Sequence, residues 1–120
     1  MPVIEVGQDR STVTFRGEVR LKDVEGALEL LYQDSAPRLT RLWDFRDAHL
    51  ELSTEEIRRV VHLLSQYPRA QVPDRIAIVT GHEVDYGMAR LGQVYIEDRI
   101  GTELVVFREM EEAESWLHGE

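Results

Sequence analysis

The chain lacks cysteine entirely, and its 120 residues include four prolines and a single lysine, Lys22. Without cysteine it can form no disulfide, no thiolate metal site and no cysteine nucleophile. No apolar run approaches the roughly 18 residues of a membrane span, and no charged start leads into an apolar stretch. We therefore expect neither a transmembrane helix nor a signal peptide, and we expect a soluble, cytoplasmic domain.

Basic residues are also scarce, because 23 acidic residues face 14 lysines and arginines and the formal net charge is −9. Nucleic acid and anionic membrane surfaces both attract basic proteins, so neither is an expected partner. The composition is 42% hydrophobic, which is ordinary for a globular protein. No repeat, linker or low-complexity segment divides the chain, and residues 1–120 are expected to form one domain.

The hydrophobic pattern predicts five strands and four helices. An opening hairpin is expected from two strands rich in β-branched residues, 3–6 and 12–15, with Gly17 ending the second. Three more strands are expected at 39–45, 75–80 and 103–107, the first followed by a loop of some seven residues. Helical periodicity covers 22–34, the segment after Ser53, the segment after His82, and 109–118.

The second helix has the clearest start signal. Ser53 stands at the N-cap position, Glu56 completes a capping box, and Leu52 with Ile57 forms a hydrophobic staple. In the third helix, one face is expected to be core, and two glycines inside the helix, Gly87 and Gly92, predict a closely packed neighbour. The residues of that face are Val84, Met88, Leu91 and Tyr95.

Strands that alternate with helices imply parallel βαβ units with right-handed crossovers, and the hairpin adds an antiparallel edge. The predicted fold class is therefore α/β, a mixed sheet of about five strands with four helices. Trp43, on the central strand, is expected in the core.

Four stretches in this order resemble the SpoIIAA-like, or STAS-like, family of small bacterial α/β domains. They are Phe15-Arg16-Gly17, Leu42-Trp43-Asp44, Gly87-Met88-Ala89-Arg90, and Val106-Phe107-Arg108-Glu109 with Glu112 to Leu117. The resemblance implies a fold related to anti-anti-sigma factors and, distantly, to lipid-binding CRAL-TRIO domains. None of the stretches is a catalytic signature, and a shared fold does not transfer function.

The resemblance also implies a phosphoacceptor. Anti-anti-sigma factors carry a phosphorylated serine in an Asp-Ser-Ser/Thr-Gly motif, at the start of the helix after the central strand. Ser53 stands in a similar place, and a phosphate there would gain from the helix dipole. Leu52 replaces the aspartate, however, and Glu55-Glu56 occupy the glycine region, so the N-cap interpretation is favoured.

Ligands of open α/β sheets usually bind at the carboxyl ends of the strands. That edge is expected to gather residues of the loops after two strands, Asp85 among them, and of the following helix. Six of these residues form the predicted ligand-binding site: Asp44, His49, Thr80, His82, Tyr86 and Arg90. Tyr86 and Arg90 are four residues apart on a helix and could frame an anionic ligand. The competing interpretation is that Arg90 pairs with Asp85 or Glu83. No histidine pair has metal-ligand spacing, so no metal or other cofactor is predicted.

Several enzyme and signalling classes are excluded by missing residues. A receiver domain needs a lysine on its last strand, and Lys22 lies in the first helix region. Nucleotide sites need a glycine-rich turn, and neither G-x-G-x-x-G nor G-x-x-x-x-G-K-[ST] occurs. An α/β-hydrolase needs a G-x-S-x-G elbow, which is also missing.

The favoured function is a non-enzymatic STAS-like binding or regulatory module that recognises a protein partner or a small apolar or anionic ligand. The alternative is a carrier of lipid or another apolar small molecule, related to CRAL-TRIO domains, with a pocket of several hundred cubic ångströms. A small hydrolase or isomerase using Asp44 and His82 is a third interpretation. A homodimer, through an edge strand or an exposed helix, is left open.

Overall fold

The computed structural model describes residues 2–7, 10–32, 40–68 and 72–119. The predicted order of strands and helices is confirmed. The elements are β1 (Val3–Val6), β2 (Arg10–Val19), α1 (Leu21–Leu31), β3 (Thr40–Leu50), α2 (Thr54–Ser65), β4 (Arg75–Thr80), α3 (Glu83–Arg99), β5 (Glu103–Phe107) and α4 (Met110–Leu117).

The five strands form one sheet whose spatial order, β1-β2-β3-β4-β5, is also their order along the chain. β1 runs antiparallel to β2, with Ile4 opposite Val13. The other three pairings are parallel. This is the expected mixed α/β sheet with an opening hairpin.

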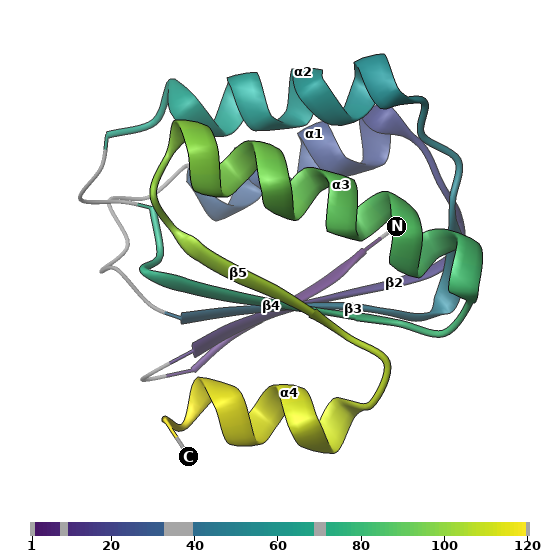
Figure 1. Ribbon diagram of the computed structural model, residues 1–120, viewed down its shortest axis with the longest axis vertical. Helices are drawn as coiled ribbons and strands as arrows, with labels where there is room; N and C mark the ends of the chain where they lie inside the picture. Colours follow the sequence, from purple (N-terminus) through teal and green to yellow (C-terminus); the bar gives the residue numbers. More distant parts are fainter. Residues whose placement is uncertain (1, 8–9, 33–39, 69–71, 120) are drawn as a thin grey trace.

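The sequential strand order decides where the helices lie. A right-handed crossover that always steps to the next strand in the same direction places its helix on the same side each time. Helices α1, α2 and α3 accordingly cover one face together, and α4, which follows the last strand, lies alone against the other (Figure 1). α4 contacts β4 and β5.

The two faces bury separate cores. On the three-helix side, Phe15 lies between Trp43 and Phe45, with ring centroids 5.9 and 5.0 Å away. Trp43 is 8% exposed, which confirms its predicted place in the core. On the α4 side, a smaller cluster joins the sheet to the helix; its buried members are Leu42, Ala77, Val79, Ala113 and Leu117.

β3 is longer than predicted. The expected loop after Phe45 is wrong, because β3 continues to Leu50 beside β2, which itself runs past Gly17 to Val19. The extension pairs 16–19 with 47–50, after an irregularity in register. Strand pairing uses backbone groups, and the mostly exposed polar side chains of 46–49 concealed it.

The predicted inward face of α3 is also wrong in part. Val84 is 78% exposed, and the buried positions of the helix are Asp85, Ala89 and Ile96. The close backbone neighbour expected at Gly92 is not found among the described residues, since the nearest atom to a Cβ there would be the side-chain Cγ2 of Ile57, at an ordinary contact distance of 3.6 Å. A Cβ at Gly87 would meet nothing within 4 Å. The expected end of the first helix near Asp34 lies outside the described residues.

Candidate functional site

Two histidines meet where β3 and β4 end. His49 lies near the end of β3, and His82 is the N-cap of α3, directly after β4. Their rings stack with centroids 3.9 Å apart and planes inclined by 19°. The parallel pairing of the two strands thus brings together two imidazoles that are 33 positions apart in sequence.

A buried carboxylate lies beneath this pair. Asp85 is 2% exposed, and its Oδ2 lies 3.7 Å from His49 Nδ1. Its Oδ1 accepts a hydrogen bond of 3.1 Å from the backbone N–H of Leu50. Oδ2 has no hydrogen-bond partner among the described residues, and the same is true of the buried Thr80 hydroxyl. The distance to His49 Nδ1 is longer than a hydrogen bond.

Asp85 was not among the six residues predicted for the ligand site. An aspartate in the first turn of a helix is ordinarily exposed and explained by the helix dipole. Nothing in the sequence therefore indicated that Asp85 is buried. The alternative that made Asp85 the surface partner of Arg90 is wrong.

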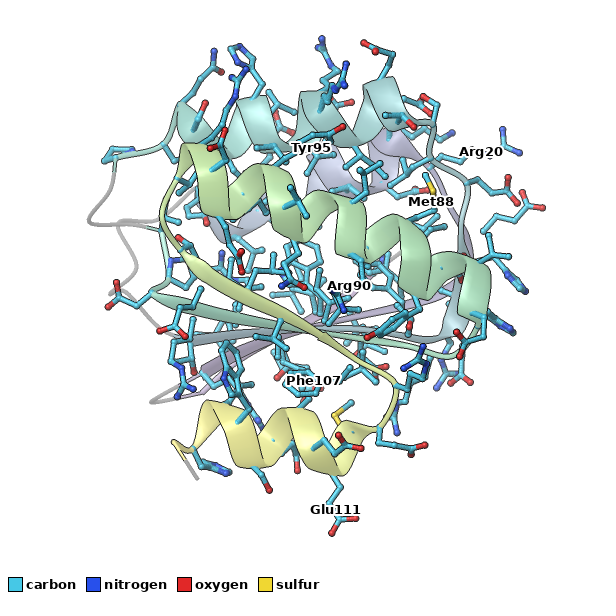
Figure 2. The ribbon with its side chains drawn as sticks, viewed as in Figure 1. Arg20, Met88, Arg90, Tyr95, Phe107 and Glu111 are labelled. Atoms are coloured by element: carbon cyan, nitrogen blue, oxygen red, sulfur yellow. The ribbon has the colours of Figure 1, made fainter. Side chains whose placement is uncertain are left out.

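Arginines and one tyrosine form the outer part of the same edge. Arg90, which extends from α3 (Figure 2), donates to the Tyr86 hydroxyl at 3.3 Å. The Arg108 guanidinium lies 3.7 Å from the centroid of the Tyr86 ring. Glu83 accepts two hydrogen bonds from Arg108, at 2.6 and 3.1 Å. This bidentate pair lowers the pKa of Glu83 and raises that of Arg108, so Glu83 is not the partner of Arg90 either.

Asp44 belongs to the opposite face of the sheet. Its neighbours in sequence, Trp43 and Phe45, point into the three-helix core, and side chains alternate along a strand. Both oxygens of Asp44 accept from the Arg46 side chain at 3.0 Å, and this pairing raises the pKa of Arg46. No interaction among the described residues joins Asp44 to His82.

The predicted capping box of α2 is present. Ser53 Oγ accepts from the Glu56 N–H at 3.2 Å, and Glu56 Oε1 accepts from the Ser53 N–H at 2.9 Å. Ser53 is exposed. Its hydroxyl therefore has a structural role, and phosphorylation of Ser53 stays a prediction.

The residues that the structure covers contain neither a metal-binding cluster nor a membrane-spanning helix. No three histidine, aspartate or glutamate side chains in those ranges lie close enough to hold a metal ion. Within the same ranges, none of the helices combines the length and the hydropathy that a bilayer crossing requires.

An apolar cavity of about 100 Å³ lies between the sheet and the three helices. The carrier interpretation placed a pocket here, between the sheet and the helices, but expected a larger one. Met88 projects from α3 toward α2 at its margin (Figure 2). The rest of the lining comes from β3, β4, β5 and all three helices and includes Trp43, Leu52, Ile57, Val60, Val61, Ala89, Gly92 and Ile96. The carrier interpretation called for several hundred cubic ångströms, and this cavity has room for a molecule far smaller than a lipid.

One cation borders the cavity. Arg41 is buried, donates to Ser11 Oγ at 2.9 Å and donates to the Tyr32 hydroxyl at 2.7 Å. Burial raises the pKa of Tyr32, and the nearby Arg41 opposes that rise. The guanidinium is thus held by hydroxyl groups at the rim, and the cavity wall itself is apolar.

The architecture is that of an α/β domain with a mixed, sequentially ordered sheet and unequal helical layers. Among solved structures, a similar chain is an uncharacterized protein of the DUF3478 family with a SpoIIAA-like fold from Shewanella loihica PV-4. The two share 21% identity and superpose with a TM-score of 0.60, over 98% of this chain and 92% of that one. The chain therefore has a SpoIIAA-like fold. No protein-family model and no curated protein matches it.

Proposed function

We propose that this chain is a non-enzymatic binding module whose ligand is a small apolar molecule, held in the cavity beneath α1, α2 and α3. The observation that carries the proposal is the cavity itself, about 100 Å³ in volume and lined almost wholly by apolar side chains. Protein interiors otherwise contain few voids larger than a water molecule.

An empty cavity of this size is costly. At roughly 24 cal/mol per Å³, it lowers the free energy of unfolding by about 2 kcal/mol, a substantial part of the roughly 5–15 kcal/mol that stabilises a domain. A bound apolar molecule recovers this loss. Apolar cavities of roughly 150 Å³ stay dry and bind benzene or xenon, so the volume matches ligands of about that size.

The cavity margin between α2 and α3 suits entry of such a ligand. Gly92 contributes no side chain there, and Met88 is an unbranched, adaptable side chain beside it. Leu52 and Val60 complete this part of the lining, and both are only partly buried. Small rotamer changes at these positions can admit a ligand without separating the helices.

The two residues of the enzyme interpretation, Asp44 and His82, lie apart, which supports a binding role. General acid–base catalysis needs its two groups within hydrogen-bond reach of one substrate. Asp44 is engaged by Arg46 on the α4 side, whereas His82 stacks on His49 at the strand ends. The hydrolase or isomerase interpretation that paired Asp44 with His82 therefore has no geometric support.

Benzene is a suitable probe of the cavity. The wild-type protein is expected to show a higher melting temperature in benzene-saturated buffer, together with shifted methyl NMR signals from cavity residues such as Val61 and Ile96. Ala89→Leu fills the space and should abolish both effects. Val94→Leu adds a methylene on the exposed side of the same helix, where Val94 is 58% exposed, and should respond as the wild type does.

Two outcomes would contradict this function. One is a wild-type protein whose melting temperature and methyl signals do not respond to benzene. The other is an equal response from wild type and Ala89→Leu. Should Ala89→Leu fail to fold, Val61→Ile adds a single methylene to the same lining and is expected to weaken the response.

A further inference from the structure

The α4 side of the sheet carries a second hollow, separate from the apolar cavity. α4 lies against β4 and β5 and also packs on Leu42 of β3. No described helix covers the same face of β1 and β2 (Figure 1). A groove of about 730 Å³ occupies this area, between the hairpin and α4. Its floor is the sheet, and one wall is the inner side of α4.

The floor of the groove is polar where a helix-covered sheet would be apolar. On β2 it is formed by Arg10, Thr12 and Thr14, and on β3 by Leu42 and Asp44. Thr12 lies opposite Leu42, and Thr14 lies opposite Asp44. Hydroxyl and charged groups would lose their hydration without compensation under an apolar partner, so this floor suits a polar ligand.

The ion pair between Arg10 and Glu114 is long, and it leaves both side chains able to form further hydrogen bonds. Arg10 Nη2 lies 3.4 Å from Glu114 Oε1, longer than the usual distance for a charge-assisted hydrogen bond. Arg10 Nη1 is buried and has no acceptor in the described part of the chain. A buried donor without an acceptor is energetically unfavourable. A ligand that offers an acceptor in the groove would therefore draw the Arg10 guanidinium toward it.

The neighbouring ion pair, Arg46 with Asp44, already satisfies both of its side chains. Arg46 spans both oxygens of Asp44 at 3.0 Å, so those two charges neutralise each other. Beyond Arg10 and Glu114, the groove then contains the imidazole of His118 and the exposed carboxylate of Glu5, which has no ion pair within the described ranges. The sum of these charges is negative, and a polyanion is therefore disfavoured.

We propose that the groove binds a free α-amino acid with an apolar side chain. Its carboxylate accepts from the Arg10 guanidinium, and its ammonium donates to Glu114 Oε1. An adjacent cation and anion on the protein match the adjacent anion and cation of the zwitterion. Met110, which is only partly buried, supplies apolar surface for the side chain beside the buried Leu42 and Leu117.

L-leucine, L-leucinamide and N-acetyl-L-leucine test this proposal by NMR titration of the wild-type protein. The amide lacks the carboxylate, and the acetylated form lacks the ammonium. We expect leucine to shift the signals of groove residues at millimolar concentrations. We expect each analogue to bind at least tenfold more weakly, which corresponds to the loss of about 1.4 kcal/mol.

Substitutions test the same contacts from the protein side. Arg10→Gln and Glu114→Gln should each weaken leucine binding at least tenfold. Arg16→Gln and Glu111→Gln serve as matched controls and should bind as the wild type does. Arg16 is exposed on the same strand as Arg10, and Glu111 points away from the sheet on the outer side of α4 (Figure 2).

The proposal is overturned if leucine at roughly 10 mM, tenfold above a Kd of about 1 mM, leaves the groove signals unchanged. Equal binding of leucine and either analogue would also overturn it, and this comparison needs no variant to fold. Since the apolar cavity lies on the other side of the sheet, benzene binding and leucine binding can fail independently.

Discussion

Gly81 and Gly87, only six residues apart, have opposite surroundings. A Cβ at Gly81 would collide with the backbone carbonyl of Arg46, whereas one at Gly87 would enter open space. Gly81→Ala is therefore expected to lower the free energy of unfolding by about 1–3 kcal/mol. Gly87→Ala, in an exposed helical position, is expected to raise it by about 0.4–1 kcal/mol.

Urea denaturation of the two variants measures both effects. Each variant is the control for the other, because both add one methyl group near the start of α3. Destabilisation by Gly87→Ala would mean that the space beside it is filled in solution, contrary to the structure.

Tyr32 provides a prediction about alkaline pH. Its folded-state pKa is raised above 10.0, chiefly by burial. The stabilisation that comes from keeping the phenol neutral is complete below pH 10, and it is lost as the pH rises through the folded-state pKa. We expect tyrosinate absorbance in the wild type to include a late-titrating component that Tyr32→Phe lacks. An unchanged titration curve in Tyr32→Phe would disprove this assignment.

Individual site residues were only partly predictable from the sequence. His49 and His82 were expected at the same edge because parallel strands bring their carboxyl ends together. The ring stacking depends on the register between β3 and β4, which composition does not encode. Asp44 was misplaced because the strand predicted to end at Phe45 continues, so Asp44 lies within a strand and faces α4.

The start of α2 is set by its capping box, and this element carries a stability prediction. Ser53→Ala removes the acceptor of the Glu56 N–H and is expected to lower the free energy of unfolding by about 1 kcal/mol. Thr54→Ala, one position further on, makes no cap and should change it by less than about 0.5 kcal/mol. Thermal denaturation of both variants gives the comparison, and equal losses would remove the capping role.

Helices and strands were predictable where their apolar side chains repeat with a helical or strand period. They were not predictable where only backbone hydrogen bonds hold the segment. α2 has an apolar stripe and a start signal, and it was located to within a residue or two. The second half of β3 is held by backbone pairing to β2. α3 is partly apolar on both sides, with Val84 and Val94 exposed, so its inward face could not be chosen from periodicity.

The sheet separates two cores, and this arrangement predicts additivity at the scale of the whole molecule. Leu117→Ala acts on the α4 side and Ile57→Val on the cavity side. Their effects on the free energy of unfolding, about 2–5 and 0.5–1.5 kcal/mol, are expected to add within about 0.5 kcal/mol. Ile57→Val and Ile96→Val share the cavity and are expected to deviate from additivity by more.

Double-mutant cycles in urea measure both couplings. Strong coupling between Leu117 and Ile57 would show that the sheet transmits packing changes from one face to the other. Additivity of the Ile57 and Ile96 pair would show that the cavity does not connect them.

The fold as a whole was predictable because alternating strands and helices leave few right-handed arrangements. The volume of the cavity and the presence of the groove were not. A void depends on how side chains from six elements meet, and no local pattern reports it. The groove exists because α4 is short and follows the last strand, so it packs mainly against β4 and β5.

The match between strand order in the sheet and strand order along the chain has a consequence for biosynthesis. Each strand that leaves the ribosome finds its neighbour already emerged, and no later segment has to insert between paired strands. Growth of the sheet can keep pace with translation. Until β5 has emerged, the nascent chain carries β4 as an unpaired growing edge, and such edges are where newly made chains associate wrongly.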